Sequence, residues 1–292
     1  MKTQIILRKV HYAFSAFLCT ACLVSCNDWL KPEPLSFYSP ENTYVTKEGL
    51  EGALVSCRAM IRPEFIGNNS YACTELMTSD VAVAGNIVAQ TLKNFEIQLK
   101  PGAYGDSQIG TFWSKGYSAI QKANTIISRV QAADEITEND KNTILAEGYF
   151  HRSYWYYKLV NQFGDVPFID KEVTTPKLDF YSHTRSSILK RLREDMMFAT
   201  RYLPESAPHG AVSKAAGNHL LAKICLACCD FGGAVAATTA VIDHSQHKLM
   251  EKRFGVNISD AQYNIISDLF NRENINSSEN LEGIFLVEDK RL

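Results

Sequence analysis

The residues from 146 to 169 constrain the fold more than any other part of this chain, because they join an aromatic-rich helical pattern to an abrupt stop. The stretch reads AEGYFHRSYWYYKLVNQFGDVPFI. Steps of three and four place a set of its residues on one helical face: Ala146, Tyr149, Phe150, Ser153, Tyr157 and Val160. The aromatic residues 154–156 fall outside that face, so the sequence predicts a helix that packs on more than one side.

The end of this helix follows from its Gly-Asp-Val-Pro sequence. Gly164 can adopt the left-handed conformation that closes a helix, and Pro167 holds Val166 in an extended conformation. Phe168 and Ile169 can then begin a new buried segment. The stretch therefore indicates a central helix in a layered all-α domain, and its chemistry is structural.

The same stretch resembles the signature of the SusD/RagB family, glycan-binding lipoproteins of the bacterial outer membrane, whose pattern is approximately A-E-A-R-F-L-R-A-x-x-Y-x-x-L-V-x-x-F-G-D-V-P. The matching residues are Ala146, Glu147, Phe150, Arg152, Tyr156, Leu159, Val160, Phe163, Gly164, Asp165, Val166 and Pro167. The departures are Gly148, Tyr149, His151 and Ser153, where the family usually has Ala, Arg, Leu and Ala.

Further landmarks of the family occur in the expected order along the chain. Its W-x-x-x-Y-x-x-I-x-x-A-N helix is resembled by Phe112, Trp113, Tyr117, Ile120, Ala123 and Asn124. Its I-x-x-D-L-x-x-A-x-x-x-L-P segment is resembled by Glu194, Asp195, Ala199, Leu203 and Pro204, with Met196 at the Leu position. Its G-R-x-T-K-x-A-A-x-x-L-L-A-K-x-x-L helix is resembled by Gly210, 213–216, 220–223 and Leu226, with Ala211 replacing Arg. The resemblance runs from Cys26 to the last residue.

This resemblance implies a mainly α fold of tetratricopeptide-like helical hairpins, an α-superhelix with irregular loops and minor short strands. It implies a surface-tethered protein without enzymatic activity, which binds an oligosaccharide or other nutrient and delivers it to a SusC-like TonB-dependent transporter. No cofactor, metal or catalytic residue is expected. The alternatives are a helical glycoside hydrolase or lyase lipoprotein and a tetratricopeptide-type adaptor that binds another protein.

The composition and charge of the chain argue against one class of binding partner, nucleic acid. The chain has 292 residues, of which 46% are hydrophobic, enough for one large domain or two smaller ones. Its formal net charge is -2, and the sequence shows no concentrated basic face. Binding to nucleic acid is therefore not expected, because contacts with phosphates require such a face.

The N-terminus predicts a lipid anchor. Basic residues precede an apolar run from Val10 to Val24, which is too short for a comfortable membrane span and is typical of a secretory signal peptide. The run ends in Leu-Val-Ser-Cys, the pattern of a bacterial lipobox, so Cys26 is the predicted site of lipidation. Cys22 is the weaker candidate, because Cys19 occupies its minus-three position. An ordinary secreted signal peptide is the remaining alternative. The resemblance implies the outer membrane, facing outward.

The body of the chain is predicted to be helical. The periodicity of apolar residues and the stop signals indicate helices at 46–62, 106–130, 137–163, 184–203, 213–229 and 234–243. Residues 68–104 are rich in Gly, Asn, Ser and Thr and are expected to form loops with short strands. Small residues on the last helices allow close approach, as in tetratricopeptide-like hairpins: Ala215, Ala216, Gly217, Ala222, Ala227, Ala234 and Ala237. Asn124 interrupts an apolar face and is expected to bond a neighbouring backbone.

The cysteines are weak candidates for a metal or redox site. Cys225, Cys228 and Cys229 have a suitable spacing, but the chain has no second C-x-x-C and His219 is too far around the helix to complete a site. We therefore expect them to be small packing residues. Cys57 and Cys73 could form a disulfide in an exported protein.

Two kinds of residue could act on or bind a sugar. A glycosidase needs two carboxylates across the scissile bond, and acidic residues gather after the signature: Asp165, Asp170, Glu172 and Asp179. Turn and surface roles are the expected explanation for them. Aromatic rings stack on sugar faces, and the loop residues Tyr71, Tyr104 and Tyr181 are possible contacts. The sequence assigns none of them, and it leaves the glycan unidentified.

The resulting domain organisation has a signal peptide at 1–25, a tether at 26–45 and a helical domain at 46–292. An apolar run at 283–287 is predicted to be a strand without an obvious partner. The family normally continues for a comparable length beyond this point. The hypothesis is a truncated gene product or one part of a split gene, with impaired glycan binding.

Overall fold

The structure is a computed structural model that describes residues 43–66, 108–134, 136–208, 210–243 and 246–287. These residues belong to one compact unit, Thr43–Leu292. The described part contains seven helices: α3 (Lys47–Phe65), α7 (Gln108–Val130), α8 (Glu138–Phe163), α9 (Arg185–Tyr202), α10 (Lys214–Ala227), α11 (Phe231–Ile242) and α12 (Ile265–Leu269). Two short strands, β1 (Val166–Pro167) and β2 (Ser182–His183), pair in antiparallel register. The fold is mainly α, as predicted.

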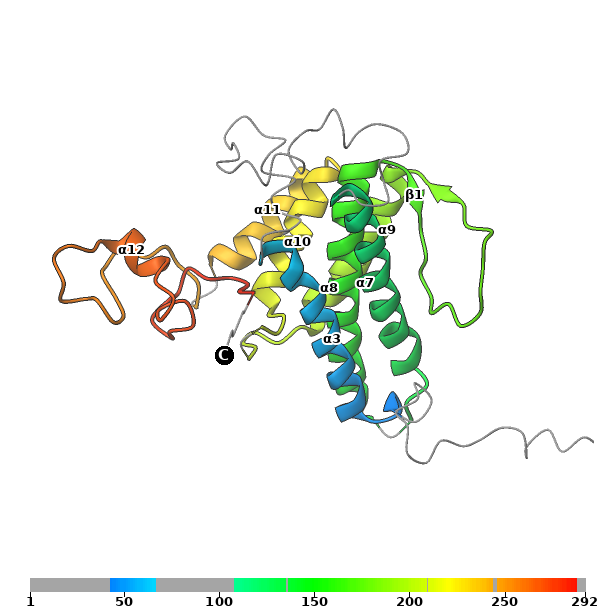
Figure 1. The fold of residues 1–292 in the computed structure, drawn as a ribbon, viewed down its shortest axis with the longest axis horizontal. Helices are drawn as coiled ribbons and strands as arrows, with labels where there is room; N and C mark the ends of the chain where they lie inside the picture. The colour runs from blue at the N-terminus through cyan, green and yellow to red at the C-terminus, as the bar shows by residue number, and fades with distance from the viewer. Residues whose placement is uncertain (1–42, 67–107, 135, 209, 244–245, 288–292) are drawn as a thin grey trace, which may run out of the picture. The chain divides into compact units, whose positions relative to one another are not determined.

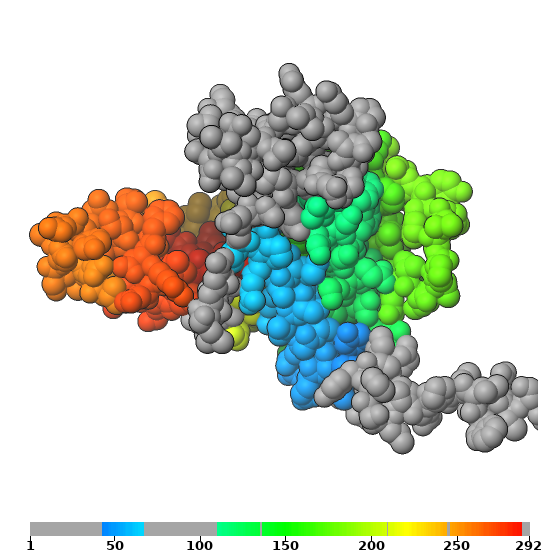
Figure 2. All heavy atoms as spheres, in the orientation of Figure 1, coloured from blue at the N-terminus to red at the C-terminus, as the bar shows by residue number. Residues whose placement is uncertain are grey.

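Helix α8 is the central helix, with α7, α9 and α3 packed around it (Figure 1). Its first turn is capped by Thr137, whose side chain accepts a hydrogen bond from the Asp140 N–H at 3.2 Å. Its last turn is closed by Gly164, where φ is 75°. The sequence predicted a helix start at residue 137 and the positive φ at Gly164. In the space-filling view, α3 lies directly against α7 on the face shown (Figure 2).

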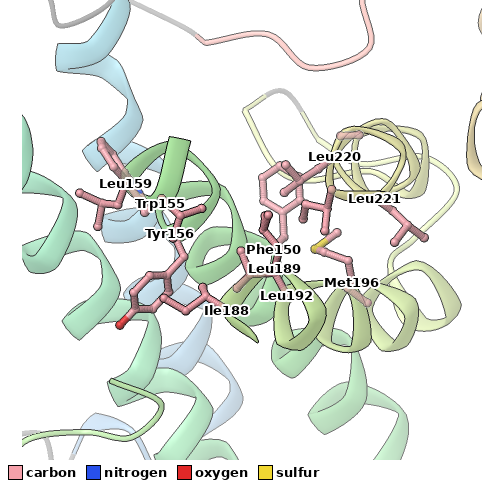
Figure 3. Close-up of a cluster of buried hydrophobic side chains, with 14 of the residues drawn as sticks. Phe150, Trp155, Tyr156, Leu159, Ile188, Leu189, Leu192, Met196, Leu220 and Leu221 are labelled. Atoms are coloured by element: carbon pink, nitrogen blue, oxygen red, sulfur yellow. The ribbon is translucent and has the colours of Figure 1, made fainter. Parts of the chain in front are cut away.

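The aromatic residues of α8 explain why its apolar contacts extend around the helix. Trp155, Tyr156 and Leu159 are fully buried. They lie in one cluster with side chains from α9 and α10, as Figure 3 shows: Ile188, Leu189, Leu192, Met196, Leu220 and Leu221. A second cluster joins the first turns of α8 to α3 and α7 through Leu50, Leu54, Ile126, Val130 and Ile144. Burial on both sides of α8 is the multi-sided packing that the sequence predicted.

Helices α9, α10 and α11 follow α8 as antiparallel neighbours. Thr184, Ser213 and Asp230 cap them, each accepting from a backbone N–H three residues later. Gly217 of α10 permits close packing, because a Cβ there would lie 2.6 Å from Cδ1 of Leu203. The predicted small residues on this pair are buried, except Ala227, which is half-buried. These hairpins match the predicted architecture.

Several predicted boundaries are wrong. Helix α3 continues past Arg62 through Pro63 to Phe65, because buried Glu64 is held in its last turn by Tyr154 and Lys158 of α8. Helix α11 begins at Phe231 and not at residue 234, because Asp230 caps it.

The predicted strand at 283–287 is also absent from the described residues. Its apolar side chains pack irregularly against the helical core, with the Phe285 ring 5.6 Å from that of Phe150. Phe168 and Ile169 are half-buried, so they do not begin a buried segment. Side-chain burial against the helices replaces the strand pairing that the apolar pattern suggested.

Candidate functional site

The segment after the signature helix is tied to α7 by side chains. Residues 165–173, called the strap below, leave α8 at Gly164. The Tyr117 hydroxyl donates to the carbonyl of Pro167 at 2.8 Å, and Nδ2 of Asn124 donates to the carbonyl of Ile169 at 2.7 Å. Asn124 therefore bonds a backbone group, as the sequence predicted.

The far end of the strap is held by α7 as well. Arg129 forms an ion pair with Glu172, with Nε 2.7 Å from Oε2. The Glu172 N–H donates to Oγ of Ser128 at 3.1 Å, and Nε2 of Gln121 donates to the carbonyl of Val173 at 3.1 Å. Helix α7 therefore binds the strap along its length. The strap in turn positions the segment that follows it.

A buried guanidinium joins the strap to two helices. Arg152 of α8 is 1% exposed, and its Nη2 donates to Oδ2 of Asp195 in α9 at 2.5 Å. Its Nη1 donates to the carbonyl of Asp170 at 3.0 Å and to Oδ1 of Asn124 at 3.3 Å. The sequence matched Arg152 and Asp195 to family positions but did not pair them. The available signal was a charged residue beside a run of aromatic residues on one helix.

A second buried polar cluster joins α8 to α3. Glu147 receives Nε and Nη2 of Arg58 at 2.6 and 2.8 Å, and Nε2 of His151 lies 3.5 Å from its Oε1. Burial alone would raise the pKa of Glu147, but hydrogen bonds from His151 and Arg58 lower it below its usual value of 4.5. Glu147 is therefore a structural carboxylate held in its charged form.

The signature residues that carry polar groups are thus occupied by structural contacts. Glu147 and Arg152 link helices, while Tyr156 accepts from the Ile169 N–H at 2.6 Å and so bonds the strap. None of these groups faces solvent, since each residue is buried. The signature builds the scaffold, which agrees with the structural interpretation of its sequence.

Residues 174–183, called the arm below, follow the strap and carry an exposed aromatic residue, Tyr181. The arm leaves the helices beyond β1 and returns through β2 (Figure 1). Tyr181 is 78% exposed and Leu178 is fully exposed. Nζ of Lys177 lies 5.5 Å from the centre of the Phe180 ring. The arm therefore presents an accessible ring beside charged groups that can bond hydroxyls.

The other aromatic candidates for a sugar contact are half-buried or lie outside the described residues. Tyr71 and Tyr104 lie outside the described residues, as does the predicted lipidation site Cys26. Trp113 is half-buried, because its ring packs edge-on against Phe163 with centroids 4.9 Å apart. Of the tyrosines that the sequence named, Tyr181 is thus the one that the described part of the chain presents to solvent.

The acidic residues after the signature have separate structural roles. Oδ1 of Asp165 accepts from the Arg185 N–H at the start of α9, at 2.8 Å. Glu172 pairs with Arg129, and Asp179 lies 3.9 Å from Nζ of Lys177. Asp170 contributes its backbone carbonyl to Arg152. Asp165, Glu172 and Asp179 thus have the turn and surface roles expected from the sequence, and the Asp170 side chain is exposed.

The cysteines of α10 lie at its end. Cys225 is buried, Cys228 is half-buried, and Cys229 is exposed with a φ of 59° in the turn before α11. Burial raises the pKa of the Cys225 thiol. Within the described residues, no group of three or more His, Cys, Asp or Glu side chains is placed to hold a metal ion. Burial likewise raises the pKa of Cys57 to about 12, and Cys73, its suggested disulfide partner, lies outside the described residues.

The segment after α11 is organised by one arginine and contains a groove. Arg253 donates to Asp268 and also to the backbone carbonyls of Asp260 and Tyr263, at 2.5 to 2.9 Å. The groove has a volume of about 1100 Å³ and is lined by residues that include Ile242, Leu249 and Met250. The Arg253 guanidinium is engaged in holding this loop together, so it does not offer a free cationic site.

Among the described helices, none combines the length and apolar content needed to cross a membrane. The apolar run at 10–24 lies outside the described residues.

Comparison with known proteins gives one consistent result. Residues 50–226 match the model of a SusD-like family described as "Starch-binding associating with outer membrane". The chain is 29% identical over 243 residues to SusD-like protein P2 of Formosa agariphila, covering 82% of this chain and 47% of that protein.

Solved structures share the fold. Surface glycan-binding protein A from Bacteroides uniformis superposes with a TM-score of 0.65 at 17% identity, covering 81% of this chain and 52% of that one. A laminarin-binding SusD-like protein superposes with a TM-score of 0.62 at 22% identity, covering 70% and 46%. The chain thus spans about half the length of the relatives it matches.

The Glu147 cluster predicts an acid-sensitive contribution to stability. The pKa of Glu147 in the folded state is lowered, so its contribution is fully present above pH 4.5 and is lost as the pH falls through the folded-state pKa. Glu147→Gln should therefore lower the free energy of unfolding by about 2 kcal/mol at pH 7, with the difference vanishing in acid. Urea unfolding across pH measures this.

Glu138→Gln is the matched control, because Glu138 lies on the same helix with a side chain that is 84% exposed. It should change stability by less than about 0.5 kcal/mol at any pH. A Glu147→Gln difference that persists undiminished at low pH would contradict the assignment of a charged, paired carboxylate.

Proposed function

The chain belongs to the SusD-like family of starch-binding, outer-membrane-associated proteins, and from that membership we propose that it binds an oligosaccharide at the cell surface. The observation that carries the proposal is the family match across residues 50–226. The glycan-binding and laminarin-binding relatives share the same fold, which supports the same class of ligand here.

The arm is our candidate for a sugar contact within the described residues. An exposed ring stacks on the C–H face of a sugar, and neighbouring polar side chains bond its hydroxyls. Tyr181 supplies the ring, while Lys177 and Asp179 supply polar groups on the same segment. The strap fixes one end of the arm and the cap of α9 fixes the other, so the arm has a rigid base.

The same proposal includes membrane attachment and delivery. Acyl chains on Cys26 would tether the mature protein to the outer membrane, since more than one chain is needed for stable anchoring. Facing outward, the tethered protein would pass its ligand to a SusC-like TonB-dependent transporter.

An enzymatic function has no supporting observation in the described residues. Of the acidic side chains in the strap, Asp165 bonds the first N–H of α9 and Glu172 forms an ion pair with Arg129. A glycoside hydrolase would need two of them facing one another across a cavity. Binding without turnover is therefore the function that the arrangement favours.

The binding test uses starch and laminarin as probes, in affinity electrophoresis followed by calorimetry on the unlipidated protein. We expect one of them to bind, without turnover, and Tyr181→Ala to weaken the affinity about fivefold, the loss expected for one stacked ring. Tyr263→Ala is the matched control, because Tyr263 is 42% exposed but lies near α12, away from the arm in sequence.

The two parts of this proposal fail separately. Binding that is equally strong in Tyr181→Ala would reject the arm while leaving glycan binding intact. Absence of binding to a broad set of plant and algal glycans, with the fold intact by circular dichroism, would reject the function.

The anchor is tested by fractionation. Cys26→Ala should move the protein from the membrane fraction to the soluble fraction, because the thioether cannot form without the thiol. Cys22→Ala is the control and should leave the protein in the membrane. Membrane association that survives Cys26→Ala would contradict the lipoprotein assignment.

A further inference from the structure

A lysine and a buried carboxylate meet where α3 ends against α8. Glu64, in the last turn of α3, is fully buried, and Nζ of Lys158 in α8 contacts its Oε1. The hydroxyl of Tyr154 donates to the other carboxylate oxygen, Oε2, at 2.5 Å. The signature pattern given above specifies neither Tyr154 nor Lys158, so these contacts are a feature of this chain beyond the signature.

The surroundings of the Lys158 amine are apolar on two sides. Its Nζ lies 5.8 Å from the centre of the Phe65 ring and 5.8 Å from the centre of the Tyr154 ring. The Lys158 side chain is 15% exposed, so the amine is largely withdrawn from water but can be reached from the surface. Withdrawal from water disfavours the charged form of an amine.

A second lysine acts on the same amine from α10. Lys223 is exposed, and its positive charge opposes protonation of Lys158. Burial, together with that like charge, lowers the pKa of Lys158 from 10.5 to about 8. An apolar site and a neighbouring cation are the two features that activate lysines toward carbonyl compounds in enzymes that form Schiff bases.

Glu64 is placed to carry the protons that such a reaction moves. Condensation of a lysine with an aldehyde removes a proton from the ammonium before attack and returns one to the departing hydroxyl. A buried carboxylate that contacts the amine can do both, because moving the proton from Nζ to Oε1 replaces a desolvated ion pair by two uncharged groups. The hydrogen bond from Tyr154 holds the carboxylate in position.

We propose that Lys158 is a carbonyl-reactive site that condenses reversibly with a small aldehyde. Nζ passes a proton to Glu64 and attacks the aldehyde carbon, and a further proton moves from nitrogen to oxygen to give a carbinolamine. Glu64 then protonates the carbinolamine hydroxyl, which leaves as water. The product is an iminium ion paired with the Glu64 carboxylate, so the charge of the pair is unchanged and no oxidant or reductant is consumed.

The aldehyde must be small, because only 15% of the Lys158 side chain is exposed. A short hydroxyaldehyde satisfies this limit, whereas a whole oligosaccharide does not. The competing explanation is a structural ion pair, in which Lys158 stays protonated and serves only to balance the charge of Glu64. The two explanations differ in the rate at which Lys158 reacts.

The test incubates the full chain at pH 7 with glycolaldehyde and sodium cyanoborohydride, which reduces an iminium ion to a stable secondary amine. Peptide mass spectrometry then gives the rate of labelling at each lysine. We expect Lys158 to be labelled about tenfold faster than Lys190, which is exposed on α9. At pH 7 an amine with a pKa of 8 is roughly one-tenth unprotonated, against about one part in 2,500 for a lysine in water, and lower basicity and restricted access reduce this advantage.

Two variants separate the role of the carboxylate from that of low basicity. Glu64→Gln removes the proton carrier and should slow the labelling of Lys158 about tenfold, although loss of the counterion leaves the amine less protonated. Lys223→Gln removes only the like charge at the surface and should slow labelling at pH 7 about threefold. Lys190→Gln is the matched control for Lys223→Gln and should leave the labelling of Lys158 unchanged.

Three results would overturn the proposal. One is labelling of Lys158 no faster than that of Lys190, which would make the contact with Glu64 a structural ion pair. Another is labelling that is as fast or faster in Glu64→Gln with its helicity intact by circular dichroism, which would assign the reactivity to low basicity alone. The third does not depend on a core substitution: it is an unchanged labelling rate in Lys223→Gln. No glycan takes part in these measurements, so their outcome is independent of the proposed function.

Discussion

The buried guanidinium of Arg152 is the interaction on which the rest of the structure depends. A charge that is 1% exposed is tolerated only if it is paired and hydrogen-bonded, and Nη1 and Nη2 of Arg152 find acceptors on α9, α7 and the strap. Those bonds fix α8 against two helices and hold the middle of the strap. The arm, the cap of α9 and the hairpins that follow take their positions from that arrangement.

This arrangement explains why the family signature identifies the scaffold and leaves the ligand open. Its acidic and basic residues bond other helices, its tyrosine bonds the strap, and its glycine and proline end a helix. Recognition must then lie on surfaces that the signature only positions. The arm, which we propose as a sugar contact, is one such surface.

Much of the fold could be predicted from the sequence, because local physics determines it. The predicted helix starts at 137, 184 and 213 coincide with residues that cap α8, α9 and α10, and the predicted stop at Gly164 closes α8. The predictions failed where contacts between residues distant in sequence determine the structure. Helix α3 continues past Pro63 because α8 binds Glu64, and residues 283–287 pack against helices instead of forming a strand. The Arg152–Asp195 pair was missed for the same reason. Of the three residues proposed for the arm's contact, the sequence analysis named Tyr181 and Asp179 but not Lys177.

The most direct test of this account is a double-mutant cycle on Arg152 and Asp195, measured by urea unfolding. Arg152→Met and Asp195→Leu should each cost about 3 kcal/mol or more. Arg152→Met leaves buried Asp195 with only the exposed Arg191, whose Nε lies 3.3 Å from Oδ1, and Asp195→Leu leaves the buried guanidinium without a carboxylate. The double variant should cost no more than the larger single change, because neither charge remains. Costs that add to within about 0.5 kcal/mol would contradict the account, since additivity means that the two residues act independently.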